Sequence, residues 1–216
     1  MLSKVKLRLL PSPRCLFDDV VRVKVEGLVP EQQVELRAKL RDDNATVWIN
    51  GCNANVMLPL HYKGMVIPPL MFDAQRAVLT KSGALDIKAS INDPMAEENK
   101  GTLIPIERAE GRFLFVAAED DKNWDSCYFA EQAIKQLRHH GKQNYEVVTY
   151  PGAGHYMETP YMPFCPSSMH RVLGQPVIWG GEPRAHAAAE VDLWKRIQLF
   201  FRSHLVEGRS CRKAQL

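Results

Sequence analysis

The chain has 216 residues, enough for one domain or two small ones with a substantial apolar core. Hydrophobic residues make up 45% of it and charged residues 25%, a balance that excludes an intrinsically disordered chain. The net charge of +3 comes without a basic run or interleaved aromatic residues, so a nucleic-acid partner is not expected. No stretch approaches the roughly 20 apolar residues of a membrane span.

Cysteine usage indicates a reducing environment. The cysteines form no C-x-x-C pair, and no charged-then-apolar signal segment opens the chain; the five are Cys15, Cys52, Cys127, Cys165 and Cys211. We therefore expect free thiols in an intracellular protein. Because no H-E-x-x-H motif or cluster of cysteine and histidine is present either, no metal ion and no other cofactor is expected.

The first third of the chain alternates polar with apolar residues. Residues 4–9 alternate charged and apolar side chains strictly, and residues 21–25 and 34–40 repeat the pattern. This period of two predicts half-buried strands, so three short antiparallel strands resembling part of a β-sandwich are expected. A mitochondrial leader in residues 1–14 is the alternative, but it would require the helical period of about 3.6 residues.

After residue 43 the pattern changes to apolar runs separated by amphipathic segments. Residues 46–49 form a short apolar run without alternation, typical of a strand buried on both faces of a parallel sheet. Residues 53–110 are predicted as loops with short elements. Further strands are predicted at 112–118 and 145–150, and helices at 126–140 and 184–205. This order predicts an α/β fold, with helices covering a parallel sheet.

Each predicted helix has one apolar face. Gly141 is expected to end the first helix. The residues expected to be buried are Phe129, Ala130, Ala133, Ile134 and Leu137 on the first helix, and Val191, Trp194, Ile197, Phe201 and Leu205 on the second. His186, near the start of the second helix, is expected to cap or pack and not to bind a ligand.

Two of the predicted strands are followed by an acid and a histidine. Asp121 lies just past the strand at 112–118, and His155 lies just past the strand at 145–150. In open α/β sheets, ligands bind beyond the carboxyl ends of strands, and an acid followed by a histidine matches the order of an α/β-hydrolase triad. Histidine would take the proton of a nucleophile, while the carboxylate would orient the ring. A surface histidine beside a solvated acidic cluster is the alternative.

Longer motifs surround these positions. They lie at residues 49–51 (ING), 60–64 (LHYKG), 105–110 (PIERAE), 150–156 (YPGAGHY) and 177–187 (VIWGGEPRAHA). In these motifs the chain resembles the acyl-CoA thioesterase and bile acid-CoA:amino acid N-acyltransferase family, densely from about residue 44 to 205. The family joins an immunoglobulin-like sandwich to an α/β-hydrolase domain. The resemblance implies a sandwich fragment at 1–43 and the C-terminal part of the hydrolase domain at 44–216.

The resemblance also implies an activity and roles for single residues. The family cleaves fatty acyl-CoA to a fatty acid and CoA, or passes the acyl group to an amino acid, through a serine or cysteine nucleophile. His155 matches the catalytic base and Asp121 the triad acid, with Asp120 as the alternative acid. A fatty acyl-CoA is thus the expected partner, as substrate or as ligand.

The family's nucleophile motif is absent from this sequence. No G-x-S-x-G or G-x-C-x-G elbow precedes the ING motif. An internal deletion near residues 43–44, an alternatively spliced form or a gene-model error would each give this pattern. Cys52 follows a predicted strand, but no helix begins behind its sulfur, so a structural thiol is the ordinary explanation. We therefore expect the chain to keep the acid and base and to be inactive alone.

Two further expectations concern self-association and location. If the neighbouring strand is missing, the strand at 46–49 becomes a sheet edge, through which a second copy could pair. The C-terminal Ala214-Gln215-Leu216 has the small-polar-leucine form of a peroxisomal address, so a cytoplasmic or a peroxisomal location is expected.

Overall fold

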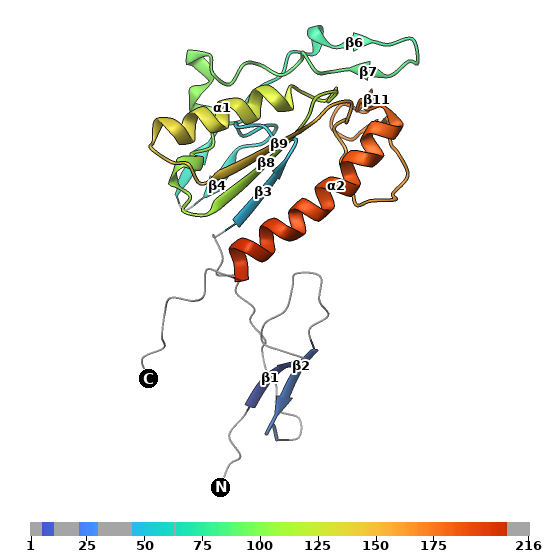
Figure 1. Cartoon of the computed structure of the whole chain (residues 1–216). Coiled ribbons are helices and arrows are strands. Elements are labelled where there is room, and N and C mark those ends of the chain that lie inside the picture. Colours follow the sequence, from blue (N-terminus) through green and yellow to red (C-terminus); the bar gives the residue numbers. More distant parts are fainter. Residues whose placement is uncertain (1–5, 11–21, 30–44, 63, 207–216) are drawn as a thin grey trace. The chain divides into compact units, whose positions relative to one another are not determined.

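The computed structural model describes residues 6–10, 22–29, 45–62 and 64–206 (Figure 1). Backbone contacts divide the chain into an N-terminal unit, Met1–Arg41, and a C-terminal unit, Asp42–Leu216. That these parts are a sandwich fragment and part of a hydrolase domain stays a prediction.

In the N-terminal unit, strand β1 (Lys6–Leu10) pairs antiparallel with β2 (Arg22–Glu26). Two of the expected strands thus form, whereas the third, at 34–40, lies outside the described residues. The predicted buried face is not formed at Val23, which remains 46% exposed. Among the described residues of this unit, β1 and β2 form a single layer, and a two-stranded hairpin by itself does not bury its apolar side chains.

The C-terminal unit is built on a parallel sheet of three strands. Its strands are β3 (Ala45–Ile49), β8 (Arg112–Ala118) and β9 (Tyr145–Tyr150), in the order β3-β8-β9. Every pairing is parallel. All three lie where the sequence predicts them, because each is a short run of apolar or β-branched residues between turn residues.

Helices cover both faces of this sheet (Figure 1). Helix α1 (Ser126–His139) packs on one face against Phe113, Phe115 and Ala117 of β8. Helix α2 (Pro183–Phe201) packs on the other, against the alternate β8 residues Leu114, Val116 and Ala118. Adjacent strand residues point to opposite faces, so the unbroken apolar run of β8 serves two cores at once.

The first helix matches its predicted face, and the second does not. All five predicted α1 residues are buried, and Gly141 follows with φ of 72°. On α2, Ile197 is buried as expected, but Val191, Trp194 and Phe201 are only half-buried. The buried residues of α2 are His186, Ala189, Glu190, Leu193, Ile197 and Phe200. The predicted buried face of α2 is wrong because two polar residues, His186 and Glu190, face inward. The buried side of the helix is therefore turned about the helix axis relative to the predicted side.

Strand β3 is not buried on both faces as its sequence suggests. Thr46 and Ile49 are exposed, Ile49 to 37%. The reason is its position, because β3 is an edge strand and, within the described part of the chain, only β8 pairs with it.

A second sheet lies beyond the carboxyl ends of these strands. It contains β6 (Val78–Leu79), β7 (Leu85–Asp86), β10 (Ser167–His170) and β11 (Gln175–Ile178), in the order β10-β11-β7-β6. The β10–β11 hairpin is absent from the sequence prediction, since Pro176 interrupts it and its residues do not alternate clearly. Short elements fill residues 53–110 as expected: the hairpin β4 (Leu60–Tyr62) and β5 (Met65–Ile67), and 3₁₀ helices at Ala74–Arg76, Glu97–Thr102 and Ile106–Arg108. The chain continues beyond α2 in one π-helical turn, Arg202–Val206.

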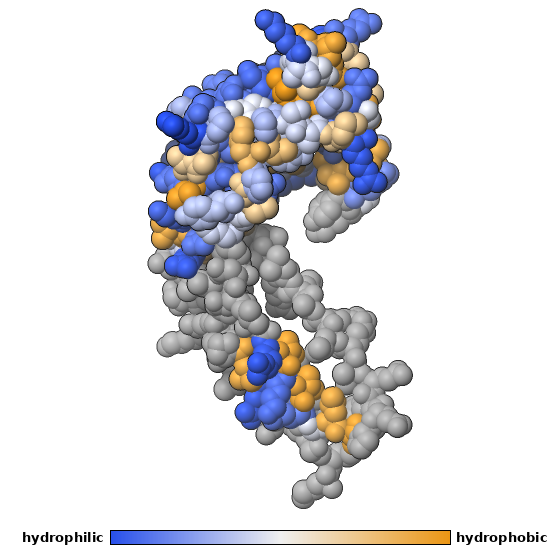
Figure 2. All heavy atoms as spheres, turned by 90° about the vertical axis from the view of Figure 1, so that its right-hand side faces the viewer, coloured by the Kyte–Doolittle hydropathy of each residue, from blue (hydrophilic) through white to orange (hydrophobic). Residues whose placement is uncertain are grey.

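The surface mixes polar and apolar residues. Figure 2 shows apolar residues interspersed among polar ones on the visible face. Among the helices that the structure describes, none is both long and apolar enough to cross a bilayer.

Candidate active site

The site forms where β8 and β9 end. Asp121 lies three residues beyond β8, and His155 lies five residues beyond β9. Because the two strands are parallel neighbours, their carboxyl ends meet at the same edge of the sheet. The β9 loop turns through Gly152, with φ of 69°. Gly154 is needed for another reason, since a Cβ there would lie 2.3 Å from the carbonyl oxygen of Gly180.

The structure brings Asp121 and His155 into direct contact. His155 Nδ1 lies 2.8 Å from Asp121 Oδ2, and the two side chains are 16% and 0% exposed. Asp121 also accepts hydrogen bonds from the backbone N–H of Asn123 at 2.8 Å and of Trp124 at 3.3 Å, and from the Ser126 hydroxyl. These hydrogen bonds fix the position and orientation of the buried carboxylate.

The other nitrogen of His155 faces an amide. Asn123 Nδ2 lies 3.2 Å from His155 Nε2. Since the Asp121 carboxylate can only accept, the His155 proton sits on Nδ1, and Nε2 accepts from Asn123. The ring is held between Trp124, at 5.3 Å between ring centroids, and Trp179, stacked at 5.7 Å. The His155 ring is therefore fixed in one orientation, with the lone pair of Nε2 directed at the Asn123 amide.

Asp120, the alternative acid, has a different role. Its Oδ2 accepts from the backbone N–H of Gly181 at 2.8 Å, and its Oδ1 lies 3.2 Å from Lys122 Nζ. The side chain is 40% exposed. Asp120 thus anchors the turn before α2, and the geometry favours Asp121 as the partner of His155.

Asn50 is a site residue that the sequence prediction missed. Its side chain is 2% exposed and donates to the carbonyl oxygen of His155 at 2.7 Å. Its Oδ1 accepts from the backbone N–H of Ala118 at 2.7 Å, and its carbonyl accepts from the Trp124 indole at 2.8 Å. Its φ of 47° is one that asparagine tolerates well. The available signal was the ING motif, in which Asn50 directly follows a strand.

Two polar residues of α2 hold the other side of the His155 loop. His186 is 4% exposed; its Nδ1 accepts from the backbone N–H of Gly154 at 3.0 Å, and its Nε2 lies 2.7 Å from the carbonyl oxygen of Tyr156. Glu190, one turn later, accepts from the N–H of Glu158 at 3.1 Å. His186 was expected to cap or pack. It is packed, and it also hydrogen-bonds the residues on both sides of His155.

Cys52 lies in a setting unsuited to a nucleophile. It is half-buried, and burial raises the pKa of its thiol to about 11. The thiolate is the reactive form, so at neutral pH almost none is present. Among the described residues, Nε2 of His155 has the Asn123 amide and no cysteine or serine as its hydrogen-bond partner. Within the same residues, no group of three or more histidine, cysteine or acidic side chains is arranged to hold a metal ion.

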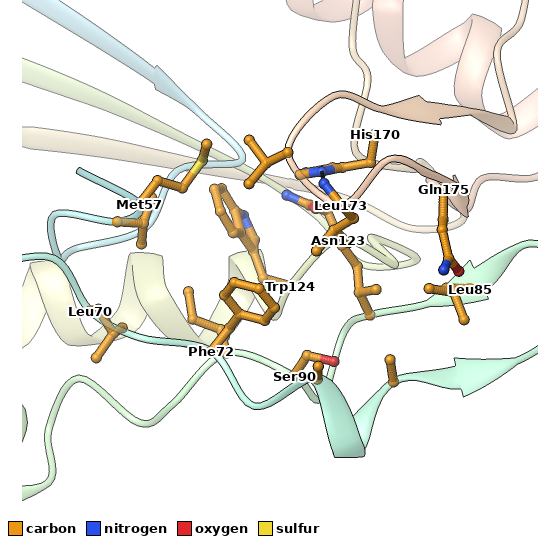
Figure 3. Close-up of a pocket in the computed structure, with 16 residues that line it drawn as sticks. Met57, Leu70, Phe72, Leu85, Ser90, Asn123, Trp124, His170, Leu173 and Gln175 are labelled. Atoms are coloured by element: carbon orange, nitrogen blue, oxygen red, sulfur yellow. Dashed lines mark hydrogen bonds between the residues drawn. The ribbon is translucent and has the colours of Figure 1, made fainter.

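An apolar cavity of about 330 Å³ lies beside the pair (Figure 3). Asn123 and Trp124, which both contact His155, form part of its wall. His170, on β10, lines it as well, and burial together with the charge of His155 lowers the pKa of the His170 imidazole. Two of the residues that contact His155 therefore border a space lined mainly by apolar side chains.

Comparison with known proteins finds relatives that share most of this chain. The chain is 47% identical over 166 residues to human acyl-coenzyme A thioesterase 2, mitochondrial, covering 77% of this chain and 34% of the relative. It is 46% identical to human acyl-coenzyme A thioesterase 1 and 44% identical to the peroxisomal succinyl-coenzyme A thioesterase of Mus musculus, in each case covering 77% of this chain and 39% of the relative. The chain thus spans well under half the length of these three proteins. Residues 32–207 match the family model described as BAAT / Acyl-CoA thioester hydrolase C terminal, and the chain therefore belongs to this family.

Proposed function

We propose that Asp121 and His155 are the acid and base of a site that acts on fatty acyl-CoA thioesters. The observation that carries this proposal is the 2.8 Å contact between His155 Nδ1 and Asp121 Oδ2, in which Asp121 is buried and His155 is half-buried. Asp121 stabilises the imidazolium that forms when Nε2 takes a proton. Positioned proton transfer of this kind contributes roughly 10²- to 10⁴-fold to a rate.

The proton would come from a serine or cysteine that attacks the thioester carbonyl. His155 takes this proton as the acyl group transfers to the nucleophile, and returns it to the departing CoA sulfur. In the second half, water attacks the acyl-enzyme, and Nε2 takes one proton from that water. The proton then passes to the nucleophile oxygen or sulfur as the free fatty acid leaves.

We propose further that this chain does not supply that nucleophile. Two observations support this: the sequence contains no nucleophile elbow, and Nε2 pairs with the Asn123 amide. A site that also lacks its oxyanion donors would lose about 3–4 kcal/mol more of transition-state stabilisation. The chain alone would then bind acyl-CoA without turning it over.

The test is release of free CoA thiol from palmitoyl-CoA by the whole chain, compared with His155→Ala and with His139→Ala as a matched control. His139 is exposed at the end of α1. We expect no release above the His155→Ala rate. Release that depends on His155 but not on His139 would confirm the base and overturn the missing nucleophile.

The acid–base assignment has its own test, which needs no turnover. In ¹⁵N-histidine NMR, the Nδ1 proton of His155 should resonate far downfield because the Asp121 carboxylate accepts it, and Asp121→Asn should abolish this signal. A His155 proton on Nε2, or a spectrum unchanged by Asp121→Asn, would reject the pair.

A second candidate is a non-catalytic binder of acyl-CoA, favoured by the cavity beside a base whose lone pair is already occupied. It predicts binding of a non-hydrolysable acyl-CoA thioether without CoA release. Acyl transfer to an amino acid remains the alternative outcome if a nucleophile is supplied. The peroxisomal or cytoplasmic location stays a prediction, since residues 214–216 lie outside the described residues.

A further inference from the structure

The cavity beside His155 has the character of a site for an apolar chain. Its volume is about 330 Å³, and its walls are mostly hydrocarbon (Figure 3). Met57, Leu70, Phe72 and Leu173 lie around it, and Met57 and Phe72 remain 53% and 45% exposed. Large apolar side chains left exposed around a hollow are typical of ligand-binding grooves.

The position of the cavity selects which part of a thioester it could take. Asn123, which forms part of its wall, is the partner of His155 Nε2, the nitrogen that would exchange protons with the reacting group. A thioester carbonyl placed at Nε2 would therefore be separated from the cavity only by the Asn123 side chain. The CoA portion is strongly charged and polar, so the acyl chain is the portion that suits these walls.

One residue in the wall has an unsatisfied polar group. Ser90 is 3% exposed and lines the cavity, and its Oγ has no hydrogen-bond partner among the described residues. Its backbone is satisfied, because its N–H donates to Ile87 and its carbonyl accepts from Asp73. A buried hydroxyl without a partner is costly, and a ligand oxygen inside the cavity would remove that cost.

We propose that this cavity binds the acyl chain of the thioester, and that Ser90 Oγ hydrogen-bonds an oxygen substituent on that chain. The assignment of the ligand as an acyl-CoA rests on the proposed function. The site should accept saturated chains up to the length that fills it. Ser90 makes it tolerant of a hydroxyl group that a purely apolar wall would reject.

The first experiment measures binding of alkyl-CoA thioethers, which cannot be hydrolysed, to the whole chain by calorimetry. Affinity should rise about fourfold per added methylene until the cavity is filled. Ala77→Phe places a large side chain in the cavity wall and should remove the dependence of affinity on chain length. The matched control is Ala187→Phe, on the exposed side of α2, which should keep that dependence. Equal length dependence in both variants would overturn the cavity assignment.

The second experiment compares a dodecyl thioether with hydroxydodecyl isomers that carry the hydroxyl at successive carbons. One hydroxydodecyl isomer should bind the unsubstituted protein at least as tightly as the plain dodecyl probe does. Ser90→Ala should weaken the binding of that isomer about tenfold, and should leave the affinity for the plain probe unchanged or higher. Ser90→Ala should also leave the thermal midpoint intact, because the hydroxyl has no partner to lose. If no isomer responds to Ser90→Ala, or if the variant unfolds at lower temperature, Ser90 has no ligand role.

Both experiments are repeated in His155→Ala, which separates this proposal from the proposed function. Chain-length dependence that persists in His155→Ala supports the cavity whatever the catalytic outcome. If free fatty acids show that dependence and the CoA thioethers bind no better than CoA itself, the cavity takes an acyl chain but not from a thioester. That result would overturn the proposal as stated, even if the ¹⁵N-histidine spectrum supports the Asp121–His155 pair.

Discussion

Replacing His186 tests how His155 is held in place. Its Nδ1 accepts from Gly154 N–H at 3.0 Å, so Nδ1 carries no proton, and the proton on Nε2 is donated to Tyr156 at 2.7 Å. Glu190 Oε1 lies 3.4 Å from the same Nε2. His186→Leu replaces the imidazole by an apolar side chain of moderate size and removes both hydrogen bonds. The Gly154 amide and the Tyr156 carbonyl then lose their partners.

The cost follows from the burial of these groups. A buried donor or acceptor left without a partner costs about 1–3 kcal/mol, so two such groups should lower the free energy of unfolding by about 3 kcal/mol after partial relaxation. For a chain of this size, each kcal/mol shifts the midpoint by roughly 2–4 °C. We therefore expect His186→Leu to unfold about 6–12 °C lower. His186→Asn, whose Oδ1 can take the place of Nδ1, should recover about half of this loss.

The assay combines thermal unfolding with amide hydrogen exchange, and His139→Leu on the exposed end of α1 is the control. A general loss of stability would raise exchange everywhere. A positioning role predicts that the amides of Gly154 and His155 exchange faster than that of Leu137, which lies in the α1 core. The reasoning is refuted if His186→Leu melts with the parent, or if Gly154 is no less protected than Leu137.

Three further outcomes can be measured. Burial raises the pKa of the Cys52 thiol from 9.0 to about 11, which leaves about a hundredfold less thiolate than in an ordinary cysteine. Iodoacetamide should therefore label the exposed Cys165 well before Cys52. Equal labelling rates would contradict this. Burial and the charge of His155 lower the pKa of His170 below 6.5, so on acidification the unfolded chain binds this proton before the folded chain does. The free energy of unfolding should therefore fall as pH drops from about 6.5 through the lower folded pKa. If the free energy of unfolding falls equally in the parent and in His170→Gln over this pH range, His170 is not the cause. Since β3 pairs on one side only within the described part of the chain, we expect concentration-dependent association in sedimentation, reduced by Thr46→Lys but not by Ala187→Lys on the exposed side of α2. Association unchanged by Thr46→Lys would place the contact elsewhere.

The sequence by itself determined the α/β architecture of the C-terminal unit. The apolar run of β8 is long enough to serve two cores, and the pattern of α1 matches its buried face at all five predicted positions. These features are local, because period and burial can be read from consecutive residues. The same reasoning placed Asp121 and His155 at two strand ends, and parallel pairing of β8 with β9 then brings them to one edge.

Only the tertiary structure decided which polar residues face inward. Asn50, His186 and Glu190 are buried, although residue type alone would place them at the surface. Each is buried because it satisfies backbone groups of the loop 154–158, and these groups lie between 32 and 105 residues away along the chain. No local pattern encodes a partner that distant. For the same reason, the sequence could not show that Asp120 turns to Gly181 or that an apolar cavity adjoins His155.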